Sequence, residues 1–428
     1  MTEPAPLLSG VRVLEASLLE PAALGMILAD LGADVIKVEP PGGDYVRTMA
    51  WPIIEGVSLL HWHVNRGKRS VELDLRTEAG VSVFLDLAAQ SDIVIEAMRP
   101  GALARRGITV ERLRERRPDL VICNVSGWGS TGPYRNIPSH GIGFDVWAGL
   151  AEPATDDEGF AYMPDHTTVG VRVTPVWGAL AVCAALLRAR ATGVGAQIDL
   201  AQSDVAAITN WFRIEGARAY ERPEEEVTGN PADGGQRRDP GITGMLGSVR
   251  YQYYRTSDGY ILLMASEREF WQNFCAAVNR MDLFEGRTGS RYADHARGDR
   301  VLQRELQQLF VTRTTAEWVA LGNSANCPIA KVNDATSITA DPAFAERLPW
   351  LPAAEFGTDL MPSPVGLIGE QRVASRRAPR PGEHTAEVLR EVLGVTGERL
   401  AELRAAGAVP DTHQPDAHQP EKSPGATQ

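Results

Sequence analysis

The sequence contains very little lysine and cysteine. Among its 428 residues four are lysines, whereas arginine is abundant. No two cysteines have the short CxxC spacing that often holds a metal. The cysteines are Cys123, Cys183, Cys275 and Cys327. We therefore expect buried free thiols in a reducing cytoplasm and no metal site.

The sequence also lacks segments that direct a chain to a membrane or out of the cell. Its start, MTEPAPLLSG, has neither a basic region nor an apolar run, so we expect no signal peptide. The longest apolar run lies between Arg172 and Arg188, short of the roughly 18 residues of a membrane span. The net charge of −12 disfavours a nucleic-acid or anionic-membrane partner. We expect a cytoplasmic protein that binds neither.

Two catalytic fingerprints and a metal cluster are missing as well. The turn after the first expected strand reads ASLLEPAALG and has no GxGxxG, which disfavours a nicotinamide or flavin cofactor. The segment 125–129 lacks the leading glycine of the GxSxG nucleophile elbow. His61 and His63 have no third ligand nearby, so we interpret them as packing or surface residues.

An alternation of strands and helices is present instead. Helical patterns separate the expected strands, which predicts an α/β fold with a parallel sheet and helices on both faces. Ligands of such sheets bind in the loops at the carboxyl ends of the strands. The first five expected strands are Val11–Glu15, Asp34–Glu39, Val71–Leu75, Asp92–Glu96 and Leu120–Val125.

Length and composition predict two domains. A polar, glycine-rich segment at 221–241 marks the boundary between them. We expect a large α/β domain at 1–220, a smaller α+β domain at 221–328, and a return to the large domain at 329–408. Residues 409–428 are proline-rich, polar and aperiodic, which predicts a disordered tail.

The stretch Tyr162–Asp199 contains the most informative pattern. Asp165 and His166 precede a long apolar run, which predicts a buried helix that ends at Thr192-Gly193. A carboxylate before such a helix faces the positive end of the helix dipole, where it is held ionised and can act as a nucleophile. The same residue pattern also suits an ordinary N-cap.

Basic loops follow several of the expected strands. Arg47 and the segment NRGKR at 65–69 lie close to strand ends, and Arg99, Arg105 and Arg106 follow the fourth strand. Guanidinium and ammonium groups in such loops suit phosphates, although solvated basic turns have the same composition. The glycine-rich segment Gly234-Gly235-Gln236 is either a linker or a lid whose amides stabilise an oxyanion.

Seven ordered segments, from Leu7 to about Val409, resemble the class III CoA-transferase family (CaiB/BaiF type), which also includes α-methylacyl-CoA racemases. They read LLSGVRVLE, LADLGADVIKVEPPGGD, NRGKRSVELDL, DIVIEAMRPGALARRG, SGWGSTGPY, RARATGVGAQIDL and APRPGEHTAEVLREVLG. The resemblance implies a Rossmann-like large domain, a small middle domain and an interlocked homodimer.

The resemblance also implies a CoA thioester as substrate and no tightly bound cofactor. The CoA-binding residues would be Arg47, Lys68, Arg69, Met98 and Arg105, and the glycine loop would be Gly234, Gly235 and Gln236. The implied activity moves CoA between an acyl-CoA and a carboxylic acid. A protein aspartate attacks the thioester to give a mixed anhydride and CoA thiolate, and the acceptor carboxylate then replaces the acyl group and receives the CoA.

The chain departs from the family pattern at the nucleophile. Two ways of aligning the helix place the family's aspartate on Val171 or on Thr174. Asp165 is the acid within reach and takes the role in our assignment, with His166 beside it. The first turn also differs, because the chain has Leu19-Glu20-Pro21 where the family has a small-residue AGP.

Two alternatives stay open at this stage. One is racemisation or isomerisation of an acyl-CoA by α-proton transfer, with His166 or His140 acting together with Asp165. The other is an acyl-CoA-binding homologue that has lost catalysis.

Overall fold

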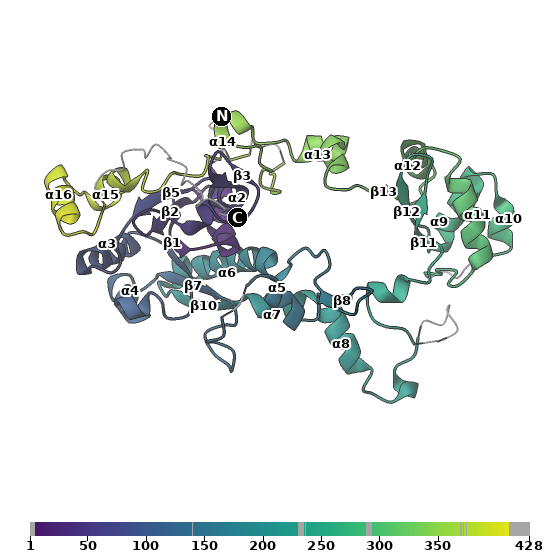
Figure 1. Cartoon of the computed structure of the whole chain (residues 1–428), viewed down its shortest axis with the longest axis horizontal. Helices are drawn as coiled ribbons and strands as arrows, with labels where there is room; N and C mark the ends of the chain where they lie inside the picture. The colour runs from purple at the N-terminus through teal and green to yellow at the C-terminus, as the bar shows by residue number, and fades with distance from the viewer. Residues whose placement is uncertain are drawn as a thin grey trace, which may run out of the picture. The chain divides into compact units, whose positions relative to one another are not determined.

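The computed structural model divides the chain into two compact units (Figure 1). It describes residues 5–138, 140–229, 235, 237–287, 293–368, 370, 372–373 and 375–410. The larger unit comprises the described residues of Met1–Thr209 and Arg347–Gln428, and the smaller unit comprises those of Asn210–Glu346. Most of the tail predicted at 409–428 lies outside the described residues.

A six-stranded parallel sheet forms the centre of the larger unit, and the predicted α/β class is confirmed. Its strand order is β10-β7-β6-β1-β2-β5, so strands that are distant in the sequence are neighbours in the sheet. Every adjacent pair is parallel. The strands are β1 (Arg12–Ser17), β2 (Asp34–Glu39), β5 (Arg69–Glu72), β6 (Ile93–Ala97), β7 (Val121–Ser126) and β10 (Ala196–Ala201).

Both faces of this sheet are buried. Successive side chains point to opposite faces, so that Val13 packs on one side and Leu14 on the other. The Val13 face is covered by α1 (Ala23–Asp30) and α6 (Gly170–Thr192). The Leu14 face is covered by α3 (Glu78–Ala89), α4 (Val110–Arg116), α15 (Thr385–Leu393) and α16 (Gly397–Ala405). Burial on both faces explains the nearly continuous apolar strands in the sequence.

Short elements connect the sheet to these helices. Several of them stand at the carboxyl ends of strands, where ligands of parallel sheets bind. They are η1 (Glu20–Ala22), η2 (Tyr45–Arg47), β3 (Ile53–Ile54), β4 (Val57–Ser58), α2 (Leu59–Asn65), η3 (Ala104–Arg106), α5 (Ile142–Trp147), β8 (Ala154–Thr155), β9 (Ala161–Tyr162), α7 (Gln202–Thr209) and α14 (Ala353–Phe356).

Helix α6 corrects the expectation that no segment is long and apolar enough to cross a membrane. It extends beyond both Arg172 and Arg188, and by length and composition its 23 residues meet that measure. Core helices of globular domains can be equally long and apolar. Of the most apolar 18 residues of α6, 44 % are buried in this structure. Val182 and Leu186 pack on the sheet, so α6 is weak evidence for a membrane.

The smaller unit has a separate core around a three-stranded antiparallel sheet in the order β11-β12-β13. Trp271, Phe274, Phe310 and Trp318 are fully buried against this sheet. The strands are β11 (Tyr251–Arg255), β12 (Tyr260–Met264) and β13 (Ile329–Lys331). The helices are α8 (Trp211–Ala219), η4 (Glu224–Glu226), η6 (Ile242–Met245), α9 (Arg268–Ala277), α10 (Met281–Glu285), α11 (Arg300–Phe310), α12 (Thr315–Ser324), η7 (Ser337–Ala340) and α13 (Pro342–Arg347).

The chain leaves the smaller unit later than the sequence indicated. Strand β13 was assigned to the return at 329–408, but it pairs with β12 and completes the small sheet. Residues up to Glu346 therefore belong to the smaller unit. The pattern of a short apolar strand does not reveal which sheet the strand joins, because either sheet can bury it.

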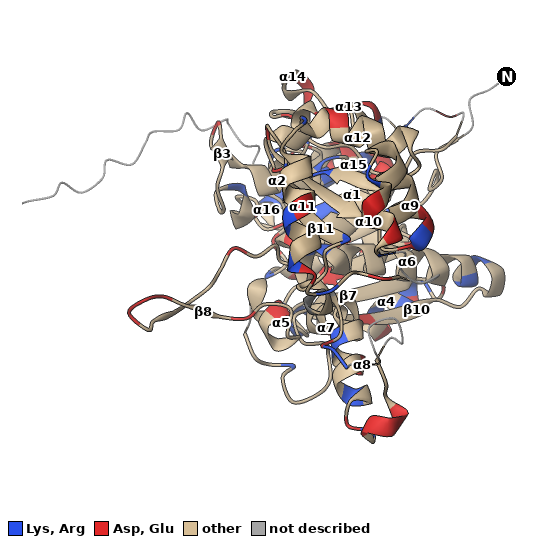
Figure 2. Cartoon of the chain, turned by 90° about the vertical axis from the view of Figure 1, so that its right-hand side faces the viewer, with Lys and Arg blue, Asp and Glu red and all other residues tan. Residues whose placement is uncertain are grey.

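Acidic and basic residues are interspersed in both units (Figure 2). Many of them form ion pairs within a unit. In the smaller unit, for example, Arg280 Nη2 lies 2.7 Å from both Asp282 Oδ2 and Glu305 Oε2.

Candidate active site

Buried charges gather in β1 and β2 and directly before β5 in the larger unit. Glu15, Lys37, Glu39 and Lys68 are each at most 1 % exposed. Four ionisable groups at this depth require partners, because burying an unpaired charge is costly. Glu15 pairs with Lys68, Lys37 with Asp44, and Glu39 with Arg47.

Lys68 is one of the predicted CoA contacts. Its ammonium is buried and binds three groups of the protein itself. Its Nζ lies 2.8 Å from Glu15 Oε2 and donates to Ala22 O at 2.7 Å and to Asn65 Oδ1 at 3.2 Å. Burial lowers the pKa of Lys68 to about 8, although the neighbouring Glu15 carboxylate raises it. The sequence revealed a lysine near a strand end and gave no sign of these partners.

Arg47 and Arg69 are also committed to protein carboxylates. Arg47 Nη2 binds both oxygens of Glu39, at 2.9 and 2.8 Å, and its Nη1 lies 2.9 Å from His61 Nε2. Arg69 Nη2 lies 2.6 Å from Asp34 Oδ2, and its Nη1 lies 2.8 Å from Glu391 Oε2 in α15. Arg69 therefore ties α15, near the end of the chain, to the sheet.

Met98 and Arg105 lie in a different setting, after β6. Arg105 is exposed, and its Nη1 donates to the backbone oxygen of Pro100 at 3.1 Å. Met98 lines a cavity of about 190 Å³ on the α4 side of the sheet. The role of Met98 and Arg105 in binding CoA stays a prediction.

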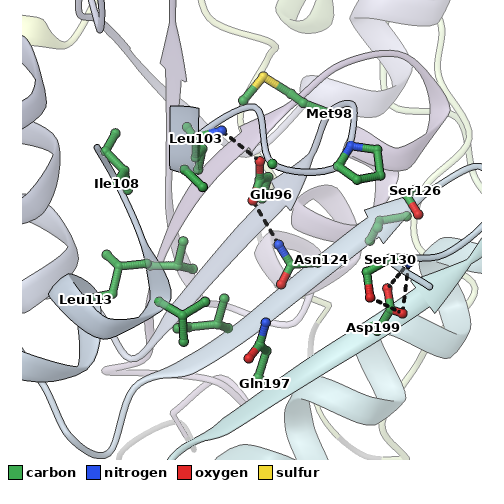
Figure 3. A pocket seen from close by; sticks show the side chains of 17 residues that line it. Glu96, Met98, Leu103, Ile108, Leu113, Asn124, Ser126, Ser130, Gln197 and Asp199 are labelled. Carbon is green, nitrogen blue, oxygen red and sulfur yellow. Dashed lines mark hydrogen bonds between the residues drawn. The ribbon is translucent and has the colours of Figure 1, made fainter. Parts of the chain in front are cut away.

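This cavity has polar groups along its floor (Figure 3). Glu96 accepts hydrogen bonds from Leu103 N at 3.0 Å and from Asn124 Nδ2 at 2.8 Å, and burial raises the pKa of its carboxyl. Two buried oxygens that face the same region, Asn124 Oδ1 and Ser126 Oγ, have no hydrogen-bond partner in the described part of the chain. The cavity therefore suits a ligand that donates hydrogen bonds.

The N-terminus of α6 is occupied by Asp145, which the sequence analysis had not selected. Asp145 lies in α5 and is fully buried. Its carboxylate accepts hydrogen bonds from Val169 N at 2.6 Å and from Gly170 N at 2.8 Å, and it lies 2.8 Å from His166 Nε2. Asp145 thus satisfies two amides that the first turn of a helix leaves free.

The structure places Asp165 apart from this arrangement. Its side chain is exposed, and no described residue forms a hydrogen bond or ion pair with it. His166, the other predicted catalytic residue, turns to Asp145 instead. The carboxylate that faces the helix dipole is therefore Asp145. The expectation that Asp165 takes this position is wrong, because α6 begins only at Gly170 and Asp165 lies in the irregular segment before it.

The two positions aligned with the family nucleophile carry no acid. Val171 and Thr174 are both buried in α6, with exposed fractions of 4 % and 0 %. Thr174 Oγ1 donates to the backbone oxygen of Gly170 at 2.6 Å, so its hydroxyl stays within the helix. Another acid near this helix is Glu20 of η1, an element that packs against α6.

The remaining predicted site residues belong to the smaller unit. Gly234 and Gln236 lie outside the described residues. Gly235 has a φ of +74°, and its backbone oxygen accepts a hydrogen bond from Gly229 N at 2.9 Å. Among the described residues no group of three or more histidine, cysteine, aspartate or glutamate side chains is arranged to hold a metal ion.

Comparison with known proteins identifies the family. The model of CoA-transferase family III matches residues 8–385. Human succinyl-CoA:glutarate CoA-transferase is 29 % identical, covering 95 % of this chain and 90 % of the relative. The "Probable fatty acyl-CoA transferase Rv3272" of Mycobacterium tuberculosis is 31 % identical, covering 91 % of this chain and 98 % of the relative.

Solved structures agree with this result. The crystal structure of Rv3272 has a TM-score of 0.72 and 28 % identity, covering 90 % of this chain and 100 % of that one. A CaiB/BaiF family protein from Brucella suis has a TM-score of 0.70 and 25 % identity, covering 91 % of this chain and 100 % of that one. The chain therefore belongs to CoA-transferase family III.

Proposed function

We propose that this protein transfers CoA from an acyl-CoA thioester to a free carboxylic acid. The observation that carries the proposal is the family match over residues 8–385, together with full-length relatives that are named CoA-transferases. Several of these names pair succinyl-CoA with a dicarboxylic acid: glutarate, malate or mesaconate. We therefore propose short acyl-CoA donors and dicarboxylic acids as the first substrates to test.

The test is a screen of CoA transfer by mass spectrometry. Purified protein is incubated with succinyl-CoA or another acyl-CoA and with a panel of mono- and dicarboxylic acids. The expected result is a new acyl-CoA whose acyl group comes from an added acid. Binding of acyl-CoA without transfer to any acid would instead favour a non-catalytic homologue. This alternative is considered because neither Val171 nor Thr174, the positions aligned with the family's aspartate, is an acid.

In the proposed route a protein carboxylate is acylated during turnover. Asp165 is the candidate from the sequence, and its assignment has a direct test. If Asp165 is the nucleophile, hydroxylamine trapping in the presence of acyl-CoA modifies Asp165, and Asp165→Ala abolishes exchange. The route requires no tightly bound cofactor, since CoA enters as part of the substrate.

One observation favours α-proton chemistry as a second candidate. His166 is 18 % exposed, and its Nε2 lies 2.8 Å from the buried Asp145 carboxylate. A buried carboxylate that orients an imidazole is a common arrangement for general-base catalysis. Incorporation of deuterium at the α-carbon of an acyl-CoA in deuterated water, without any acceptor acid, would support this alternative.

We also propose that the protein acts as a homodimer in the cytoplasm. Val176, Trp177, Leu180 and Leu187 of α6 are exposed large apolar side chains in the single chain. Exposed apolar residues that share one element commonly mark a protein interface. Light scattering coupled to size-exclusion chromatography tests this proposal, and a mass of one chain at micromolar concentration would contradict it.

A further inference from the structure

The turn after β1 differs from the family pattern and is held from both sides. It contains Leu19 followed by Glu20, the first residue of η1. Lys37 Nζ donates to Ser17 O at 2.8 Å on one side of the turn, and Lys68 Nζ donates to Ala22 O at 2.7 Å on the other. Two of the few lysines of the chain are thus buried where they fix the backbone around Glu20.

The backbone of this turn is also strained. Leu19 has φ 59° and ψ −154°, a region that is populated almost only by glycine. Such a conformation persists where the surrounding structure imposes it, and strained residues cluster at functional sites. Here the two lysine contacts hold the backbone on both sides of Leu19. They thereby fix the direction in which the chain enters η1.

Glu20 lies in η1 and is influenced by the charge of Arg172, which stands near the start of α6. The element that carries it, η1, packs against α6, α1 and α2. Burial raises the pKa of the Glu20 carboxyl, and the positive charge of Arg172 in α6 opposes that shift. Arg172 also lies near His63 of α2, whose pKa is lowered to about 4 mainly by burial, so His63 is neutral at pH 7.

Glu20 is half-buried and uncommitted, unlike the other acids of this region. No described residue forms a hydrogen bond or ion pair with its carboxylate. Asp145 is occupied by two amides and His166, and Glu15 is occupied by Lys68. Asp165 is uncommitted as well but is exposed to water, which solvates a carboxylate and weakens it as a nucleophile.

We propose that Glu20 is the catalytic carboxylate that is acylated during CoA transfer. The family's aspartate aligns with Val171 or Thr174 of α6. In this chain the acid would instead come from η1, which packs against α6. The inference rests on the proposed CoA-transferase function and names the residue that performs it. Arg172 would serve as a positioning residue that keeps the Glu20 carboxylate ionised.

The chemistry balances with the groups at hand. An oxygen of Glu20 attacks the thioester carbon, the C–S bond breaks, and CoA leaves as the thiolate, which produces an acyl–glutamyl anhydride. The acceptor carboxylate attacks the side-chain carbonyl carbon of Glu20, and the donor acid leaves with the bridging oxygen. The thiolate then attacks the acceptor's acyl carbon and releases the Glu20 carboxylate.

Oxygen exchange gives a residue-specific test. Each turnover replaces one oxygen of the nucleophilic carboxylate by one from the acceptor acid. Wild-type protein is therefore incubated with succinyl-CoA and glutarate labelled with ¹⁸O, then digested and sequenced by mass spectrometry. The expected result is ¹⁸O at Glu20, and hydroxylamine trapping with succinyl-CoA alone is expected to give a hydroxamate at the same residue.

Variants supply the second test. Glu20→Gln is expected to reduce transfer more than about a thousandfold, because it removes the group that forms the covalent intermediate. Glu158→Gln, at an exposed glutamate in the β8–β9 turn, is the matched control and is expected to retain full transfer. Circular dichroism and thermal unfolding verify that Glu20→Gln is folded.

Each outcome decides between the two proposals. Label or hydroxamate at Asp165, or undiminished transfer by Glu20→Gln, would overturn the role of Glu20 and leave the CoA-transferase function intact. A hydroxamate at Glu20 without transfer to any acid would support Glu20 and contradict the transferase function. If neither a hydroxamate at Glu20 nor transfer to any acid is found, the role of Glu20 and the CoA-transferase function are both overturned.

Discussion

His166 Nε2 lies 2.8 Å from Asp145 Oδ2, although the two residues are 21 positions apart in the sequence. The same carboxylate accepts hydrogen bonds from Val169 N and Gly170 N at the start of α6. One buried aspartate thus holds both the start of the helix and the histidine that precedes it. This relationship determines which acid of the region is free to react.

The first prediction concerns Asp145 as the cap of α6. Asp145→Ala removes two amide hydrogen bonds to a charged acceptor and is expected to lower the free energy of unfolding by about 3 kcal/mol. His166→Ala removes one contact of a partly exposed ring and is expected to cost about 1 kcal/mol. Urea unfolding monitored by circular dichroism measures both, and equal losses would contradict the capping role.

The second prediction concerns the buried ion pair of Lys68 and Glu15. Lys68→Met leaves Glu15 as an uncompensated buried charge and is expected to lower the free energy of unfolding by about 3–5 kcal/mol. The double variant Lys68→Met/Glu15→Gln removes that charge and is expected to recover more than half of the loss. A double-mutant cycle by chemical unfolding measures the coupling, and additive losses would show that the pair is not coupled.

The third prediction is a dependence of stability on pH. Burial, followed by the positive charge of Arg47, lowers the pKa of His61 from 6.5 to about 3. Between these values the unfolded chain binds a proton that the native state excludes, so stability falls as the pH falls below 6.5. At pH 4.5 the expected loss from His61 is roughly 2–3 kcal/mol. His61→Gln should flatten the pH profile of urea midpoints, and an unchanged slope would rule out this origin.

The fourth prediction concerns Arg105, the exposed arginine after β6. Arg105→Gln is expected to weaken CoA binding about tenfold and to reduce its dependence on salt, because a charge-assisted phosphate contact is lost. Arg116→Gln, on the exposed side of α4, is the matched control. Isothermal titration at two salt concentrations measures the effect, and equal affinities for both variants would exclude Arg105 from the CoA site.

Several properties followed from the sequence alone. Apolar strands separated by amphipathic helices specify a parallel sheet buried on both faces, since only that arrangement covers such strands. The seven family-like segments gave the family and the expected activity, and the family is confirmed. Local patterns were sufficient here because hydrophobic periodicity and turn residues act over short distances along the chain.

Only the tertiary structure decided which charged groups are free. Lys68 and Arg69 are consecutive basic residues in the sequence, but in the structure they pair with Glu15, Asp34 and Glu391. Asp165 and Glu20 are both isolated acids in the sequence. Only folding leaves Asp165 in water and half-buries Glu20 in η1, which packs against α6. The physical reason is that burial and pairing depend on contacts between distant segments, which spacing along the chain does not encode.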